Sequence, residues 1–260
     1  MTAAVDSDST QTLLLMAIFA LASLLHGISG LGVTLVTTTA LASMYPLPYA
    51  IVLVIFPSLL LNAMTWLAGG ERTIWQNFIY YGRRYWLLAL TSLLGSILGA
   101  KLLLIVDSAY ILLLLAAVIG YYVISSLLGK QIKLPNTKPV LIIVGFSAGI
   151  IGGSTNAMST ILMMYLLSAS DDKNTIAKVG NMCYLLGKIA QIIVLREPIM
   201  ALSHGEWQLI ALLSVLSVVA LLIGIRMRRY LPQARFRQLI LVILTVLGLR
   251  VGWQGITAFL

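Results

Sequence analysis

The sequence predicts an all-α protein that crosses a membrane many times, and three observations lead to this prediction. Of its 260 residues, 60% are hydrophobic and 10% are charged, whereas a soluble domain carries roughly 25% charged residues because water must wet its surface. After Asp8 the next charged side chain is Glu71, and residues 139–170 form a second uncharged run. These runs are continuously apolar, unlike the alternating strands of a membrane β-barrel. A spanning helix takes about 20 residues, so the chain has room for eight to ten membrane segments and no soluble domain.

Polar residues, prolines and glycines divide the chain into eight apolar blocks. Six of them have the length of one helix each, and these are 48–68, 85–106, 108–128, 176–195, 207–225 and 238–254. The blocks 12–45 and 139–169 are too long for one ordinary span at 1.5 Å per residue. Each holds a glycine cluster, namely Gly27, Gly30 and Gly32 in the first and Gly149, Gly152 and Gly153 in the second. We therefore expect two short helices that meet at the glycines, either as two crossings or as a re-entrant hairpin.

The basic residues predict the orientation. If both long blocks turn back at their glycines, the two sides of the membrane receive very unequal numbers of Lys and Arg. One side receives Arg72, Arg83, Arg84, Lys130, Lys133, Lys138, Lys173, Arg226, Arg228, Arg229, Arg235 and Arg237, and the other receives Lys101, Arg196 and Arg250. Since basic residues collect in cytoplasmic loops, the first side is expected to be the cytoplasm. Both termini then lie outside, which is the periplasm for a bacterial inner-membrane protein. Residues 72–85 are expected to form an interfacial helix on the cytoplasmic surface.

A weak repeat divides the chain into a first membrane repeat, 1–129, and a second, 130–260, which together form one transport domain. Gly27-Ile28-Ser29-Gly30 recurs as Gly149-Ile150-Ile151-Gly152, and Gly99-Ala100-Lys101 recurs as Gly224-Ile225-Arg226. Each half holds a glycine-broken short-helix pair and three further helices. Five passes are an odd number, so the second half enters from the opposite face, which predicts two inverted repeats of the kind common in secondary transporters. Chance similarity between glycine-rich apolar segments is the alternative.

Lys188 is the most informative single residue. It lies near the centre of the predicted helix 176–195, where a lysine costs at least about 2.5–3.5 kcal/mol. On a helix it shares one face with Asn181, Tyr184 and Gln191, and the block 48–68 carries a milder stripe of Ser58, Asn62 and Thr65. No acidic residue in the apolar segments is placed to neutralise Lys188, so it is suited to receive an anion. A lysine satisfied by backbone carbonyls and water is the alternative.

The glycine clusters predict the rest of the site. Discontinuous helices expose backbone N–H groups and positive dipole ends at membrane depth, where they can hold an anion without a metal or another cofactor. His26, directly before the first break, could donate to an anion or carry a proton, and a structural histidine is the alternative. Packing through small residues is the alternative for the glycines. The predicted substrate-binding residues are Lys188, His26, Ser29, Gly30, Gly32, Thr34, Asn62, Gly152, Gly153, Ser154, Thr155, Asn156, Asn181 and Tyr184.

The sequence argues against several other classes. The net charge of +9 follows from the loop bias rather than from a nucleic-acid surface. No metal-binding spacing, nucleophile elbow or phosphate-binding loop is present, so we expect neither an enzyme nor a metal site. The single cysteine, Cys183, allows no internal disulfide. The expected partners are a small anion, the lipid bilayer and, left open, further copies of the chain.

The chain resembles the TauE/SafE family, the sulfite exporters and toluene-sulfonate uptake permeases. The resemblance covers essentially the whole chain and rests on the order and duplication of several segments. These are His26 to Gly32, Gly145 to Gly153, Leu94-Gly95 with Gly99-Ala100-Lys101, Gly224 to Arg229, and the end from Arg237 to Leu249. It implies transport of sulfur-containing anions across the inner membrane, with the site between the two glycine-rich segments.

Together these observations predict a secondary transporter for small sulfur oxyanions such as sulfite, a sulfonate or thiosulfate. An inside-negative potential drives a monoanion outward by about 2.3 kcal/mol per 100 mV. Export therefore needs no coupling, whereas import needs a proton or another cation, for which His26 is the only candidate we find. Export is accordingly favoured. The alternative function is a non-transporting membrane scaffold or assembly subunit whose polar stripe packs on a partner.

Overall fold

The computed structural model describes residues 9–30, 33–68, 72–128, 134–135, 137–170, 172–227 and 233–259, and in this part of the chain all regular structure is helical. The helices of the first half are α1 (Ser9–Ser29), α2 (Val33–Ala42), α3 (Leu47–Leu67), α4 (Ile74–Arg84), α5 (Trp86–Ile105) and α6 (Ser108–Leu128). Those of the second half are α7 (Lys138–Thr155), α8 (Met158–Ala169), α9 (Lys173–Val194), α10 (Arg196–Met200), α11 (His204–Met227) and α12 (Gln233–Thr257). The all-helical class predicted from the sequence is confirmed.

Both long apolar blocks are interrupted, as predicted. The first breaks after α1 at Gly30, whose φ is +78°. The second breaks after α7 at Asn156, whose φ is +62°. A left-handed residue ends a helix because it turns the next amide out of the helical path, and glycine and asparagine adopt it most readily.

The position of the second break corrects the sequence interpretation. Gly149, Gly152 and Gly153 lie inside α7, and the break comes three residues after Gly153. The arms are also unequal rather than similar in length. α1 and α7 have 21 and 18 residues, whereas α2 and α8 have 10 and 12. At 1.5 Å per residue the short arms measure only about 15 and 18 Å, roughly half the thickness of a bilayer core.

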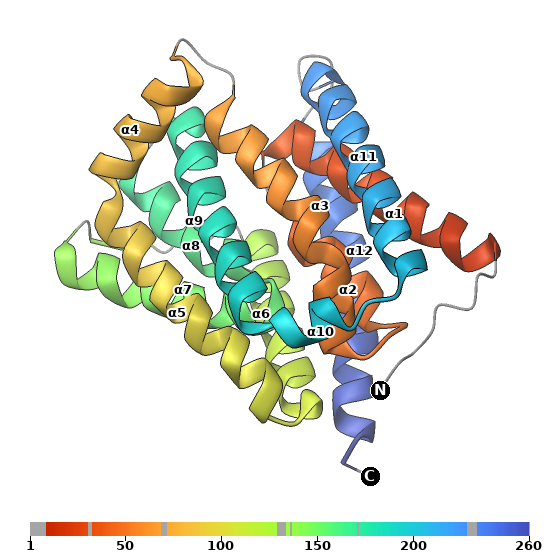
Figure 1. The fold of residues 1–260 in the computed structure, drawn as a ribbon. Coiled ribbons are helices and arrows are strands. Elements are labelled where there is room, and N and C mark those ends of the chain that lie inside the picture. The colour runs from red at the N-terminus through yellow and green to blue at the C-terminus, as the bar shows by residue number, and fades with distance from the viewer. Residues whose placement is uncertain are drawn as a thin grey trace.

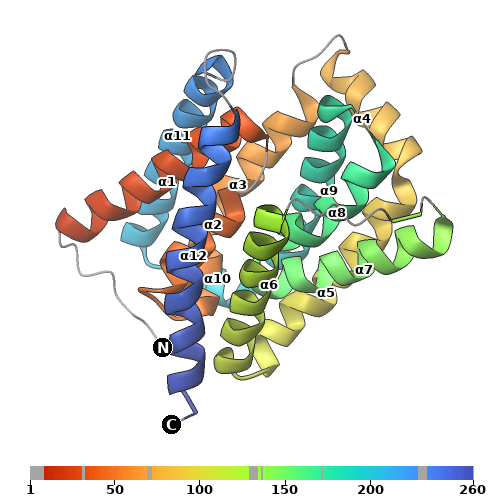
Figure 2. The same ribbon diagram turned by 180° about the vertical axis from the view of Figure 1, so that it is seen from behind.

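The helices pair across the two halves of the chain. α3 and α9 pack side by side and run in opposite directions (Figure 1), as do α6 and α12 (Figure 2). α5 packs on α7, and α11 packs on α1. α1 and α7 lie on opposite flanks of the molecule in both views. The long arm of each interrupted block therefore packs on a helix from the other half of the chain: α1 packs on α11, and α7 packs on α5.

Glycines allow these crossings to be close. A Cβ atom added at Gly27 would lie 2.3 Å from the carbonyl oxygen of Leu221 and 2.9 Å from the amide nitrogen of Ile225. A Cβ atom added at Gly153 would lie 2.3 Å from the carbonyl oxygen of Ser96 and 2.8 Å from the amide nitrogen of Ala100. Ser96 and Ala100 on α5 thus take the place that Leu221 and Ile225 take on α11.

The predicted repeat stays a prediction, but these contacts bear on its register. Gly99 and Gly224 both lie in the segments that receive the crossing glycines. Gly27 and Gly153 each lie three residues before a left-handed residue, whereas the repeat predicted from the sequence pairs Gly27 with Gly149.

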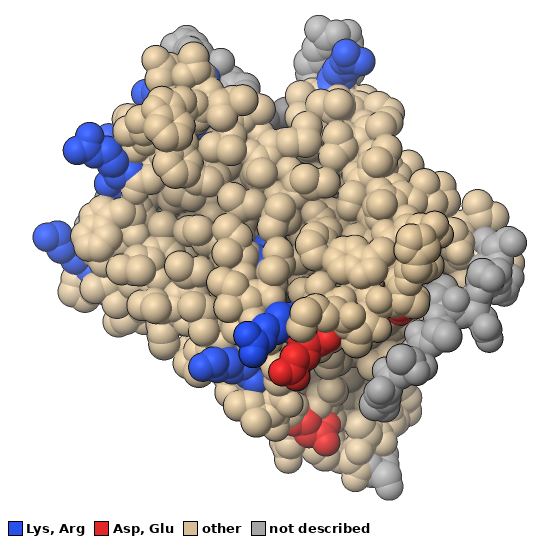
Figure 3. Space-filling view, in the orientation of Figure 1, with Lys and Arg blue, Asp and Glu red and all other residues tan. Residues whose placement is uncertain are grey.

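Six helices are long and apolar enough to cross a membrane: α1, α3, α5, α6, α7 and α11. Three shorter apolar helices are Val33–Ala42, Met158–Ala169 and Leu241–Thr257. α9 has 22 residues, but its polar side chains lower its hydropathy, so it is not among the six. The protein is thus a multi-pass membrane protein. In Figure 3 uncharged residues cover most of the visible face, and acidic residues show only in the lower half of the view.

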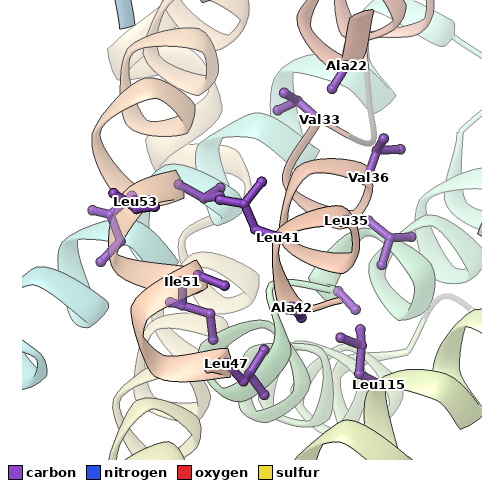
Figure 4. Packing of buried hydrophobic residues seen from close by; sticks show 14 of the residues in the cluster. Ala22, Val33, Leu35, Val36, Leu41, Ala42, Leu47, Ile51, Leu53 and Leu115 are labelled. Atoms are coloured by element: carbon purple, nitrogen blue, oxygen red, sulfur yellow. The ribbon is translucent and has the colours of Figure 1, made fainter. Parts of the chain in front are cut away.

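The described residues form two apolar clusters, one around α2 and α3 and the other around α8 and α9. α2 is buried along its whole length. In Figure 4 its residues Val33, Leu35 and Val36 lie among Ala22 of α1, Leu115 of α6 and residues of α3. Such a short helix is marginal alone, so α2 depends on this packing for its position. The core therefore fixes one side of the first break.

α4 forms a helix as predicted. Its N-terminus carries a capping box, in which Thr73 Oγ1 accepts a hydrogen bond from the Gln76 amide (3.3 Å) and Gln76 Oε1 accepts one from the Thr73 amide (2.9 Å). Four large apolar side chains, Ile74, Trp75, Phe78 and Ile79, stay exposed on it. The expected position of α4 at the membrane surface stays a prediction.

Replacing Gly27 by alanine should destabilise the fold, because its Cβ would meet the backbone of α11 and force α1 and α11 apart. Overpacking of this kind costs about 1–3 kcal/mol, so the melting temperature in detergent should fall by several degrees. Gly120→Ala is the matched control, because a Cβ added there meets nothing within 4 Å. Equal melting temperatures for the two variants would contradict the close crossing.

Candidate functional site

One face of α9 joins the two helix breaks. Asn181, Tyr184, Lys188 and Gln191 lie on that face at intervals of three, four and three residues, and all four are buried. The helix starts at Asp172, whose carboxylate accepts hydrogen bonds from the amides of Asn174 (3.1 Å) and Thr175 (3.0 Å). These bonds satisfy amides at the helix N-terminus. The predicted polar stripe is therefore present and points inward.

Lys188 is 4% exposed and has only neutral partners among the described residues. Its ammonium group donates to Asn156 Oδ1 and, over 2.8 Å, to Gln191 Oε1. Burying an ammonium group is costly unless its charge is compensated. Two amide oxygens supply only partial negative charge, so in its protonated form Lys188 keeps a net positive charge that a bound anion can neutralise. The site is therefore electrically suited to an anion.

Asn156 holds the second break against two other helices. Its side-chain nitrogen donates to Thr38 Oγ1 (2.7 Å), and its carbonyl oxygen accepts from Thr34 Oγ1 (3.1 Å), so both bonds reach α2. Gln191 completes the network, because its Nε2 donates to Asn156 Oδ1 and to Gly153 O, each over 2.9 Å. We call Lys188, Gln191, Asn156, Thr34 and Thr38 the Lys188 network.

The first break is held by different residues. Asn181 donates from Nδ2 to the carbonyl oxygen of Gly30 (2.9 Å) and to that of Ala177 (2.8 Å). One turn before this break, His26 contacts Thr65 of α3 (Nε2 to Oγ1, 3.2 Å). Asn62, three residues before Thr65, is 1% exposed, and neither amide atom of its side chain has a hydrogen-bond partner.

Several buried polar atoms near the breaks keep unused hydrogen-bonding capacity. They are the Asn62 amide nitrogen and oxygen, Asn181 Oδ1, Tyr184 Oη, Thr160 Oγ1 and His26 Nδ1. An unsatisfied buried polar group costs about 1–3 kcal/mol, and such groups are rare enough to call for an explanation. Donors among them, on Asn62, Tyr184 and Thr160, can serve an oxyanion.

Other predicted residues have roles different from those expected. Gly152 and Gly153 lie within α7, so their amides belong to that helix, and it is their carbonyl oxygens that face Gln191. The hydroxyl groups of Ser154 and Thr155 donate to Ile150 O (2.9 Å) and Ile151 O (2.6 Å) of the same helix. Gly32 and the side chain of Ser29 lie outside the described residues.

The predicted site lacks two residues of the network, Thr38 and Gln191, and the sequence interpretation also missed one structural lysine. Thr38 was not singled out, since nothing in the Thr37-Thr38-Thr39 run marks its middle member. Lys178 is 2% exposed and donates to Trp66 O (3.1 Å) and Ala68 O (2.8 Å), so it caps the end of α3. Its signal was available, because it lies in the same predicted helix as Lys188, ten residues earlier. Gln191 was noted on the stripe but not placed in the site.

The family model described as "Sulfite exporter TauE/SafE" matches residues 15–251. The chain belongs to this family. No curated protein and no solved structure matches the chain. TauE/SafE is a family of membrane transporters, which agrees with the six span-forming helices. In this TauE/SafE chain the Lys188 network therefore lies inside a transporter fold, between its two broken helices.

The left-handed backbone at Asn156 gives a test of the second break. Asn156→Gly and Asn156→Ala both remove the side-chain contacts to Lys188, Gln191 and Thr38. Both variants must adopt φ +62° at this position, but only alanine is strained by it, because glycine has no Cβ. That conformation costs a residue with a Cβ about 1 kcal/mol or more. In a thermal melt in detergent, stability should fall from Asn156 to glycine to alanine. A glycine variant no more stable than the alanine variant would contradict the left-handed geometry.

Proposed function

We propose that the protein is a secondary transporter that moves small sulfur-containing oxyanions, of the sulfite, sulfonate or thiosulfate type, out of the cell. The observation that carries this proposal is Lys188, a buried ammonium group whose partners are neutral amide oxygens. The ammonium group binds an anion more strongly than it binds the two amide oxygens. The anion carries a full negative charge, whereas each amide oxygen carries only a partial one. The family supports a sulfur-containing substrate.

The surrounding donors favour an anion with several oxygens. Lys188 offers an ammonium group, two of whose three hydrogens are donated to Asn156 and Gln191, and Tyr184 and Asn62 offer unpartnered hydroxyl and amide donors. α8 begins at Met158 without a side-chain cap. The Thr160 amide donates to Ala157 O (3.2 Å), whereas the amides of Met158 and Ser159 precede the first intrahelical acceptors. A tetrahedral or pyramidal oxyanion can accept from several of these groups at once, whereas a monatomic anion such as chloride presents no separate acceptor atoms.

We further propose that residues 1–129 and 130–260 are inverted repeats. The antiparallel pairs α3 with α9 and α6 with α12, the crossed pairs α5 with α7 and α11 with α1, and the matching left-handed residues all support this relation. In that correspondence Asn62 of α3 takes the place of Lys188 of α9. With the short arms included, the protein would have up to ten membrane segments around one site. Inverted repeats of this kind are suited to alternating access around a central site.

The scaffold alternative gains no support from the Lys188 network. A scaffold would use this lysine to bind an acidic residue of a partner, but Lys188 is enclosed by α7 and α9 of its own chain. Transport in liposomes therefore separates the two functions most directly.

Counterflow in proteoliposomes tests the transport function. Liposomes preloaded with unlabelled sulfite, thiosulfate, sulfoacetate, sulfate, acetate or chloride are placed in a trace of radiolabelled thiosulfate or sulfite. The sulfur oxyanions should drive uptake of the label, and Lys188→Gln should reduce the rate at least tenfold because the anion loses its only buried cation in the network. Exchange needs no driving force, so this result does not depend on a coupling ion.

Lys178→Gln is the matched control for this experiment. It also removes a buried lysine from α9, but one that caps α3 and has no contact with the Lys188 network. Per folded molecule, its exchange rate should exceed that of Lys188→Gln. Rapid exchange by Lys188→Gln, or no exchange of any sulfur oxyanion by the folded native protein, would overturn the proposal.

Labelling of engineered cysteines tests the proposed orientation, in which α4 is cytoplasmic and the start of α11 is periplasmic. Gly82→Cys and Gly205→Cys suit this test, because a Cβ at either position meets nothing within 4 Å. In a Cys183→Ser background, a membrane-impermeant maleimide should label Gly205→Cys in intact cells and Gly82→Cys only after permeabilisation. The reverse pattern would place both termini in the cytoplasm.

A further inference from the structure

His26 lies one turn before the first break, where α1 meets α3 and α9. It is 1% exposed, it belongs to the last turn of α1, and its Nε2 lies 3.2 Å from Thr65 Oγ1 of α3. On its other side the imidazole interacts with the side chain of Asn181 of α9. The other histidine of the chain, His204, lies at the start of α11 and contacts exposed Gln208. Only His26 is therefore enclosed beside the proposed transport site.

The hydroxyl group of Thr65 determines which imidazole nitrogen carries the proton. That hydroxyl donates its only hydrogen to the carbonyl oxygen of Leu61 (2.9 Å). Towards His26 its oxygen can then only accept, so Nε2 of His26 must be the donor. In the neutral imidazole Nδ1 is consequently an acceptor with a free lone pair. Nδ1 is buried and has no hydrogen-bond partner.

Asn181 presents a second acceptor without a donor. Both hydrogens of its Nδ2 are used, one on Gly30 O (2.9 Å) and one on Ala177 O (2.8 Å). These two bonds fix the orientation of the amide group, so the remaining atom is the oxygen Oδ1. Oδ1 is buried and also lacks a partner. The His26–Asn181 pair therefore holds two acceptors and no proton.

We propose that His26 is the proton-binding site of the transporter and that one proton crosses the membrane together with each anion. This inference rests on the transport function proposed above. The Nδ1 lone pair takes a proton from a hydronium ion, whose O–H bond breaks and which leaves as water, and the new N–H bond donates to Asn181 Oδ1. On the other side of the membrane the N–H bond breaks, and the same proton passes to water to form hydronium again. Each acceptor of the pair then has a partner.

The helices packed around His26 carry few titratable side chains. α2 has none, and those described on the other helices are Tyr49 on α3, Lys178, Cys183, Tyr184 and Lys188 on α9, His204, Glu206 and Arg226 on α11, and Arg250 on α12. Glu206 is the one carboxylate among them, and it accepts hydrogen bonds from Tyr49 and Ser203 rather than from His26. No carboxylate of these helices therefore neutralises a protonated His26, and an anion in the site would do so.

The position of Asn181 links the proton to the anion. It lies on the same face of α9 as Lys188, two turns away, and it also holds the carbonyl oxygen of Gly30 at the first break. A proton on His26 adds positive charge to the site and so strengthens binding of the anion. The anion in turn favours the protonated histidine. This reciprocity is required of any two linked binding equilibria.

The charge balance follows directly. A monoanion that travels with one proton carries no net charge, so the membrane potential does not drive it, and net flux follows the gradients of anion and pH. Export of this neutral pair proceeds whenever the product of anion and proton concentrations is higher inside the cell. A dianion such as thiosulfate carries one net negative charge together with its proton, so an inside-negative potential also drives its export.

The test measures proton movement together with anion movement in proteoliposomes. A pH-sensitive dye in the lumen should report acidification when an inward thiosulfate gradient drives uptake by the native protein, with one proton per labelled anion. His26→Gln keeps an amide hydrogen for Thr65 but cannot take up a proton. In this variant, lumen acidification should fall at least tenfold per transported anion. His204→Gln is the matched control and should retain one proton per transported anion.

Three outcomes are distinguishable. Counterflow by the native protein without lumen acidification during net uptake would overturn the proton-binding role while leaving the transport function intact. Proton movement that persists in His26→Gln would also overturn it. Absence of counterflow in the native protein would overturn the transport function itself. The stoichiometry measurement uses the native chain, so it decides the matter even if His26→Gln does not fold.

Discussion

Two interrupted helices place backbone polar groups inside an apolar body, and the rest of the structure depends on how these groups are satisfied. Water can bind the free amides and carbonyls of a helix end at a protein surface, but the interior of a membrane offers none. Here the face of α9 supplies the partners. Asn181 binds the carbonyl oxygen of Gly30, and Gln191 binds that of Gly153. One helix therefore supports both breaks and aligns Lys188 with them.

This arrangement explains why α9 is much less apolar than α3, the helix that packs against it. Each polar residue on its inner face has a structural partner or an unused donor or acceptor beside a break. Its outer face can remain apolar, as exposed Ile189 and Ile193 show. The close crossings at Gly27 and Gly153 hold the long arms in place, so the polar face of α9 meets helix ends at defined positions. The polar contacts of α9 thus depend on the close packing of the glycines, because that packing fixes where the helix ends lie.

Much of this could be predicted from the sequence, because membrane helices must be apolar and of fixed length. The interruption of both long blocks and the inward stripe around Lys188 follow from block length and helical periodicity. The position of the second break could not be predicted, because Gly149 and Gly153 serve packing on α5, Gly152 packs against Met158 of α8, and the left-handed residue is Asn156. Glycine is ambiguous in this respect, since it permits both a close crossing and a turn.

The side-chain roles were harder to predict than their positions. Ser154 and Thr155 lie where expected, but their hydroxyl groups bind carbonyls of α7, a choice that only local geometry decides. Gln191 belongs to the network because Lys188 needs a second oxygen, which a pattern of polar residues does not reveal. Lys178, at the start of α9, caps α3, a helix more than a hundred residues away in the chain. Contacts between such distant segments leave no periodic signal.

The two breaks are tethered unequally, and this has a consequence for where the molecule yields first. Among the described residues, Asn156 makes hydrogen bonds with Lys188, Gln191, Thr34 and Thr38, whereas Gly30 is held across the break by Asn181 alone. Local opening begins where the fewest interactions must be lost. A fluctuation that loosens Gly30 releases one bond and leaves the Lys188 network whole, while loosening Asn156 dismantles that network. Of the two left-handed residues, Gly30 is therefore the one whose displacement breaks fewer hydrogen bonds to other helices.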